Sequence, residues 1–269
     1  MKRVFVCVLV LLLFSTISFA GEKLVIKGST TVLPIAQKAA ETYMNTHPGV
    51  SVSVSGGGSG TGIKAILDGI VDIADSSREV KPKEFELAKE KGMILTVHPI
   101  ALDAVVPVVN PKNSVGNLTL KQLHDIYTGK IKNWKEVGGK NIRMVVISRD
   151  SSSGTFEVWN KKVMHKDRVT PRALLQASNG AVREAVAKNK NAIGYIGLGY
   201  TNKQVKPVSI DGVMGSKDSV RKGKYPVSRI LYMITSDSSK QAVSYNFIGF
   251  VLSSAGQQIV QQEGFIKLR

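Results

Sequence analysis

The sequence predicts an α/β fold with largely parallel sheets flanked by helices. Two observations carry this prediction. Apolar segments typical of strands alternate along the chain with segments whose apolar residues recur at helical spacing. In addition, three strand-to-helix junctions contain the same mixture of glycines and small hydroxyl residues. A chain in which strands and helices alternate forms mostly parallel sheets covered by helices.

The first twenty residues have the features of an export signal. Lys2 and Arg3 form a short basic start, the apolar run "VFVCVLVLLLF" follows, and "SFA" is a small-residue site at which we expect cleavage after Ala20. The apolar run is shorter than a membrane-spanning helix requires. Cys7 is the only cysteine and lies inside this run, so the rest of the chain has no disulfide framework.

The charge balance is strongly basic. Among 269 residues there are 37 Lys and Arg against 20 Asp and Glu, for a formal net charge of +17. Such a field favours anionic partners, which include nucleic acids, anionic lipid surfaces and small oxyanions. However, the lysines are scattered, and the aromatic residues are too few to form the stacking platform of a single-strand-binding protein. We therefore expect a basic, solvated surface and no nucleic-acid partner.

The three junctions share one pattern. "EKLVIKGSTTVLPIAQKAAETYM", residues 22–44, predicts a strand, a turn of glycine and hydroxyl residues, and a helix. "VSVSVSGGGSGTGIKAILDG", residues 50–69, predicts an alternating strand, a glycine-rich turn and a second helix. "IRMVVISRDSSSGTFEVWNKKVM", residues 142–164, repeats the arrangement with an arginine, an aspartate and three serines in its turn.

The junctions suit an anion because of what a helix start offers. Its first four N–H groups have no partner within the helix, and the helix dipole places partial positive charge there. Glycines allow a ligand to approach the backbone closely, and hydroxyl groups add rotatable donors. One such junction is ordinary helix capping. If all three helix starts converge, they form a cage for a small anion.

The rest of the chain continues the alternation. "TLKQLHDIYTGK" has a capping box of Thr119 with Gln122 and a stop at Gly129. Two more segments predict helices and three predict buried strands: "VREAVAKN" and "KQAVSYNFIGFVLSS", then "ALDAVVPVVN", "NAIGYIGLG" and "SRILYMIT". No linker separates two independent domains, so two lobes would be joined by chain crossings.

Other chemistries find little support. "GTGIKA", residues 60–65, matches a dinucleotide fingerprint, but no acidic residue clearly ends a second strand about 20 residues later. Lys64 is not followed by Ser or Thr, so the loop is not a phosphate-binding Walker A loop. The chain has no G-x-S-x-G elbow, no histidine in a telling context and no metal-ligand spacing. We therefore expect no catalysis, no metal and no cofactor.

Four segments, taken in order, resemble the periplasmic phosphate-binding proteins of phosphate-specific ABC transporters, in their compact bacterial form. They are "GSTTVLPIA", "SGGGSGTGIKAILDGIVDIADSSRE", "SRDSSSGTFEVW" and "NAIGYIGLGY", and the resemblance runs from about Lys23 to the C-terminus. It implies the two-lobed type II periplasmic-binding-protein fold with a ligand cleft between the lobes. It also implies lobe 1 at residues 21–100 plus about 228–269 and lobe 2 at about 101–227, after a signal peptide at 1–20.

The resemblance assigns the phosphate site residue by residue. Arg149 matches the arginine that grips the phosphate, and the helix start beside it supplies Ser153, Gly154 and Thr155. The second junction supplies Ser59. The first junction supplies a loop of four residues: Ser29, Thr30, Thr31 and Val32.

One position departs from the pattern of the family. Ser77 stands where some members carry an aspartate that accepts the proton of phosphate. The candidates for that acceptor here are Asp75, two positions earlier, and then Asp150 or Asp72. Asp150 could equally hold Arg149 in place. Such a carboxylate matters because phosphate keeps a proton near neutral pH, whereas sulfate has none to donate.

The sequence therefore predicts a monomeric protein of the periplasm that captures inorganic phosphate. Its further partner would be the permease and ATPase complex of an ABC transporter in the inner membrane. The nearest alternative is the same scaffold binding another oxyanion, sulfate or molybdate. An exported phosphatase-type hydrolase is a second alternative. A surface that binds polyanions is a third, and its binding would depend steeply on salt.

Overall fold

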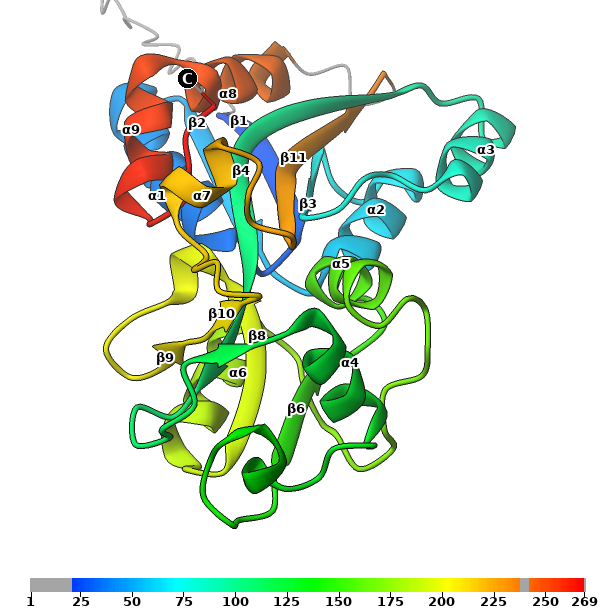
Figure 1. The fold of residues 1–269 in the computed structure, drawn as a ribbon. Coiled ribbons are helices and arrows are strands. Elements are labelled where there is room, and N and C mark those ends of the chain that lie inside the picture. Colours follow the sequence, from blue (N-terminus) through cyan, green and yellow to red (C-terminus); the bar gives the residue numbers. More distant parts are fainter. Residues whose placement is uncertain (1–20, 238–241, 269) are drawn as a thin grey trace, which may run out of the picture.

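The computed structural model describes residues 21–237 and 242–268. The predicted export signal, residues 1–20, lies outside them. The described chain forms two lobes, each with helices packed on strands, and one long strand runs from the upper lobe into the lower one (Figure 1). No helix in these two ranges has the length and apolar composition needed to cross a membrane.

The upper lobe in Figure 1 contains the first two predicted junctions. Its strands are β1 (Glu22–Gly28), β2 (Val50–Ser55), β3 (Ile73–Ser76) and β11 (Ser228–Ser236). β1 lies between β2 and β3 and is parallel to both. The helices of this lobe are α1 (Leu33–Thr46), α2 (Ser59–Leu67), α3 (Pro82–Glu90), α8 (Ala242–Leu252) and α9 (Ser254–Gln262).

The lower lobe contains the third junction. β6 (Val145–Arg149) lies between β7 (Leu174–Gln176) and β8 (Ala192–Gly197) and is parallel to both. The helices here are α4 (Leu120–Thr128), α5 (Gly154–Lys162) and α6 (Asn179–Lys188). α7 (Lys217–Arg221) lies beside the upper lobe in Figure 1, although its Val220 belongs to the same buried cluster as the core of the lower lobe. Short elements complete the lobe: β5 (Asn117–Leu118), β9 (Lys206–Pro207), β10 (Ser209–Ile210) and the 3-10 turns Trp134–Val137 and Leu198–Tyr200.

One long strand connects the sheets of the two lobes. β4 (Leu95–Val109) pairs with β11 through residues 95–104 and with β8 through residues 105–109, so it belongs to the sheets of both lobes. These pairs are antiparallel, and so is the pair of β11 with β3. The predicted α/β fold is confirmed. Within the named strands of the main sheet, the antiparallel pairs all involve β4 or β11.

The buried apolar residues form separate clusters. One cluster draws on residues 104–227 together with Ile266, and two others draw on residues 24–101 and 231–265. This division supports the lobe boundaries expected from the sequence, which we keep as a proposal. Below, lobe 1 means residues 21–100 and 228–268, and lobe 2 means residues 101–227.

Each junction takes a form that its residues favour. Ser153 caps α5, since its hydroxyl accepts a hydrogen bond from the N–H of Phe156 at 3.2 Å. Gly58 precedes α2 with a φ of 102°, and a Cβ there would lie 2.7 Å from the carbonyl oxygen of Ser152. Glycine is therefore required where the two lobes touch.

Candidate functional site

The three predicted helix starts meet between the lobes. The hydroxyl oxygens of Thr31, beside the start of α1, and Thr155, in the first turn of α5, lie 3.1 Å apart. The hydroxyl of Ser59, which begins α2, lies 3.3 Å from that of Ser77, and a Cβ on Gly154 would come within 2.7 Å of Ser77 Oγ. The structure thus brings residues of both lobes and all three junctions to one place.

Arg149 occupies the last position of β6 and is only 2% exposed. Its Nε donates to the carbonyl of Gln176 at 2.8 Å, and its Nη2 donates to the carbonyl of Ala177 at 3.0 Å. Its Nη1 has no hydrogen-bond partner among the described residues. Burial lowers the pKa of Arg149, and the charge of Asp150 opposes this shift. A clamped, buried guanidinium with one free edge suits an anion.

A second buried arginine was missed by the sequence reasoning. Arg229 lies in β11, and its Nε and Nη2 donate to Oδ2 of the fully buried Asp103, in β4, at 2.8 and 2.7 Å. Burial raises the pKa of Asp103 and lowers that of Arg229, and the pairing of the two opposes both shifts. One signal was available, because each residue is a lone charge inside an apolar segment, and the two charges have opposite signs.

Arg229 also fixes the direction in which two hydroxyl groups donate. Its Nη2 donates to Thr31 Oγ1 at 3.1 Å, and its Nη1 donates to Thr155 Oγ1 at 3.0 Å. Thr31 Oγ1 accepts a further bond from Nδ2 of Asn179 at 3.0 Å. Because a hydroxyl oxygen has two lone pairs, Thr31 has only its own hydrogen left to offer. In the threonine pair, Thr31 is therefore the donor and Thr155 the acceptor. Thr155 Oγ1 then accepts from both Thr31 and Arg229, so its own hydrogen is the one left for a ligand.

Asn179 is a further residue that the sequence reasoning missed. It begins α6, is fully buried, and donates to Thr30 Oγ1 as well, while its own Oδ1 accepts from the N–H of Gly197 at 3.0 Å. α6 is thus a fourth helix that starts at the site. The segment "ASNG", residues 177–180, contains the same small polar residues as the three junctions, but it precedes the predicted helix "VREAVAKN" and was not recognised as a junction.

The first loop is buried with the rest of the site. Ser29, Thr30, Thr31 and Val32 are each no more than 6% exposed. The hydroxyl of Ser29 accepts from the N–H of Thr31 at 3.1 Å, which shapes the turn before α1. Ser77 donates its N–H to Ser59 Oγ at 3.0 Å, so the position that departs from the family pattern lies beside the second junction.

The three candidate aspartates differ in their surroundings. Asp72 accepts from the N–H of Val25 at 2.8 Å, and Asp150 accepts from the N–H of Ser152 at 2.9 Å and from its hydroxyl. Asp75 is 1% exposed, and neither of its carboxylate oxygens has a hydrogen-bond partner in the described part of the chain. Burial raises the pKa of Asp75 well above its ordinary value of 3.8.

This shift predicts a pH dependence of stability. A carboxyl with a raised folded pKa stabilises the fold most below its unfolded pKa, and that contribution is lost as the pH rises through the folded pKa. The free energy of unfolding of the wild type, compared with that of Asp75→Asn, should therefore fall as the pH increases. Urea unfolding of both proteins without phosphate, from about pH 4 to about pH 8, measures this difference. A constant difference would contradict the assigned pKa direction.

Gly154 is expected to tolerate no side chain. A Cβ there would lie 2.7 Å from Ser77 Oγ and closer still to Ser59 Oγ, so Gly154→Ala should force the two lobes apart. We expect phosphate binding to weaken by about 1–3 kcal/mol, the usual cost of overpacking. Gly180→Ala, in the first turn of α6, is the control, since its Cβ would meet nothing closer than 3.8 Å. Calorimetric titration of both variants measures the effect, and equal affinities would refute it.

Comparison with known proteins places this geometry in a family. Residues 16–255 match the PBP superfamily domain. The chain is 31% identical over 284 residues to the phosphate-binding protein PstS of Borreliella burgdorferi, with 100% of both chains covered. It is 33% identical over 250 residues to that of Bacillus subtilis, covering 92% of this chain and 81% of the relative.

A solved structure agrees with these relatives. A phosphate ABC transporter substrate-binding protein from Clostridium perfringens, with bound phosphate, superimposes with a TM-score of 0.87 at 34% identity. The match covers 92% of this chain and 100% of the other. The chain therefore belongs to the PBP superfamily and, within it, to the family of phosphate-binding proteins named PstS.

Proposed function

We propose that the protein captures inorganic phosphate between its lobes and delivers it to an ABC transporter for import. The observation that carries this proposal is the buried guanidinium of Arg149, whose Nη1 has no hydrogen-bond partner among residues 21–237 and 242–268. Arg149 binds the carbonyl of Ala177, two residues before Asn179, which donates to the hydroxyl groups of Thr30 and Thr31. At the same meeting point of the lobes, the hydroxyl of Thr155 keeps a hydrogen for a ligand. A tetrahedral oxyanion accepts hydrogen bonds from several directions, and the guanidinium and hydroxyl groups described here supply donors from both lobes.

We further propose that Asp75 accepts the proton of the bound phosphate. Of the three candidates it alone has no hydrogen-bond partner within the described ranges, whereas Asp72 and Asp150 are occupied by neighbours. A buried carboxylate repels a bare dianion such as sulfate. The lost hydrogen bond and the repulsion together are worth several kcal/mol, or more than about a hundredfold in affinity.

The proposal includes no chemical reaction. The relatives named above are binding proteins rather than enzymes. We also propose that the protein is a monomer of the periplasm, exported by the signal at residues 1–20. Its partner would be the permease and ATPase complex of the transporter in the inner membrane.

Titration calorimetry of ligand-stripped protein with phosphate, and then with sulfate, tests the proposal. Tight one-to-one binding of phosphate that excess sulfate does not displace is the expected result. Preferential binding of sulfate or molybdate would keep the scaffold but change the substrate. Binding of none of these anions would contradict the proposal, and turnover of a chromogenic phosphate ester would then reveal a hydrolase.

A further inference from the structure

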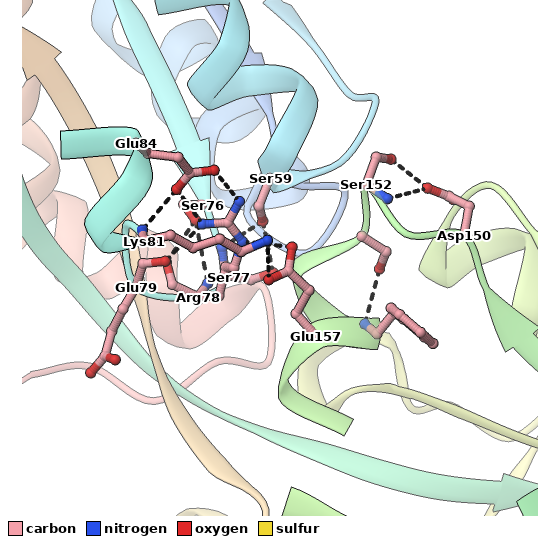
Figure 2. A network of polar contacts seen from close by, with 12 residues as sticks. Ser59, Ser76, Ser77, Arg78, Glu79, Lys81, Glu84, Asp150, Ser152 and Glu157 are labelled. Carbon is pink, nitrogen blue, oxygen red and sulfur yellow. Dashed lines mark hydrogen bonds and ion pairs between the residues drawn. The ribbon is translucent and has the colours of Figure 1, made fainter. Parts of the chain in front are cut away.

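A second polar network joins the lobes beside the anion site. Its centre is Arg78, which directly follows Ser77 and is 6% exposed. Nη1 and Nη2 of Arg78 donate to the two carboxylate oxygens of Glu84 at 2.8 and 2.7 Å, and its Nε donates to Oε1 of Glu157 at 3.0 Å. Figure 2 shows the guanidinium between these two acidic side chains. Lys81 completes the network with an ion pair to Glu157 at 2.8 Å.

The two acidic partners belong to different lobes. Glu84 lies in the first turn of α3 in lobe 1, the same lobe as Arg78, and its carboxylate also caps that helix by accepting from the N–H of Lys81 at 2.8 Å. Glu157 lies in α5 of lobe 2. Arg78 therefore uses one edge of its guanidinium to hold its own lobe together and its Nε to reach the other lobe.

The ion pair between Arg78 and Glu157, here called the interlobe pair, is connected at both ends to residues of the anion site. On lobe 1, the hydroxyl of Ser76 donates to the carbonyl of Arg78 at 2.7 Å and accepts from its N–H at 3.3 Å, and Ser77 follows Ser76 in the chain. On lobe 2, the N–H of Glu157 donates to the carbonyl of Ser153 at 3.1 Å within the first turn of α5. The interlobe pair thus sets the position of the polar groups around Ser77, on lobe 1, relative to those at the start of α5, on lobe 2.

The contacts that cross between these parts of the lobes are polar. Besides the threonine pair, the N–H of Gly60 donates to the carbonyl of Ser152 at 2.9 Å, and the Ser152 hydroxyl donates to the carbonyl of Gly57 at 3.1 Å. Polar interfaces between parts of one chain generally resemble transient protein–protein interfaces, across which relative motion is expected. A single charge-assisted contact can therefore alter how long the lobes stay together. A contact that forms only when the two lobes meet stabilises the arrangement in which they are together, here called the closed state, and no other arrangement.

We propose that Glu157 is a positioning residue that holds the two lobes in register around the bound anion and slows its release. The proposal rests on the proposed function, because it concerns the same anion. Glu157 does not bind the ligand itself; it acts through Arg78 and Lys81. Its carboxylate is 20% exposed, so part of its attraction is screened by salt.

The test compares Glu157→Gln with Glu84→Gln, two variants that each remove one acidic partner of Arg78. Phosphate dissociation is measured by stopped-flow displacement, and melting temperature by calorimetry without phosphate. Glu157→Gln should accelerate dissociation by about tenfold, the value of one charge-assisted hydrogen bond, with little change in association. The difference from wild type should shrink at high salt. Glu84→Gln should lower the melting temperature but leave dissociation within about twofold of wild type.

Each other outcome overturns the inference. Wild-type dissociation in Glu157→Gln would show that the interlobe pair does not hold the ligand. Equal acceleration of phosphate dissociation in both variants would show that losing either carboxylate partner of Arg78 has the same effect. The contact between the lobes would then have no special role. Neither result would touch the proposed function, because the wild type would still bind phosphate. Absence of phosphate binding by the wild type would overturn both.

Discussion

Arg149→Ala is expected to weaken phosphate binding by about 2–5 kcal/mol, because it removes the buried charge that we propose pairs with the anion. In the described part of the chain, the side-chain hydrogen bonds of Arg149 go to backbone carbonyls rather than to a carboxylate, so the unfolding free energy of the ligand-free protein should not fall by a comparable amount. Titration calorimetry gives the first quantity and urea unfolding without phosphate gives the second.

Arg149→Lys is the matched control. It keeps a positive charge but cannot reproduce the two bonds to the carbonyls of Gln176 and Ala177 together with a third directed at the anion. We expect an affinity between those of the wild type and the alanine variant. An alanine variant that binds phosphate like the wild type would remove Arg149 from the site.

Asp103→Asn should lower the unfolding free energy by about 3–5 kcal/mol, because it leaves Arg229 as an uncompensated charge in the protein interior. Asp103 is fully buried and accepts bonds from Arg229 at 2.8 and 2.7 Å and from the N–H of Leu198 at 2.9 Å. Chemical unfolding monitored by circular dichroism measures the loss. Asp218→Asn removes the partner of Lys222 from an exposed ion pair and should change stability little. A similar loss in both variants would contradict the prediction.

A double variant separates stability from binding. Asp103→Leu with Arg229→Met replaces the buried ion pair by apolar side chains of similar size, which often restores stability. Phosphate binding should stay weak, because Thr31 and Thr155 lose the donors that direct their hydroxyl groups. Recovery of stability together with full affinity would show that Arg229 serves the fold alone.

The parts of the site that could be predicted are those with local signals. Glycines and hydroxyl residues between a strand and a helix mark Ser59, Gly154 and their neighbours, since capping chemistry depends on residues a few positions apart. Arg229 meets Asp103 and Thr31 across sequence separations of 126 and 198 residues, and Asn179 reaches Thr31 across 148. No local pattern encodes such meetings, which arise only when the sheet is assembled.

The fold shows the same contrast. Alternation of strands and helices predicted the parallel units, because each unit is built from consecutive residues. The direction of β11 was not predicted, since "SRILYMIT" reads as a buried strand whichever neighbour it pairs with. Its place between β3 and β4 depends on chain segments more than a hundred residues away.

That placement of β11 has a consequence for how the molecule assembles. β11 is the last strand along the chain within the described residues, yet it fills a central position in the sheet, flanked by strands that end and begin near residues 76 and 95. Before β11 is synthesised and takes its place, β3 and the first half of β4 lack the strand that lies between them in the sheet. The closing step therefore joins early and late segments, which makes folding slow and dominated by non-local contacts. The amino-terminal half of the polypeptide, as it leaves the ribosome, must wait for nearly the whole remainder before its own sheet can be completed.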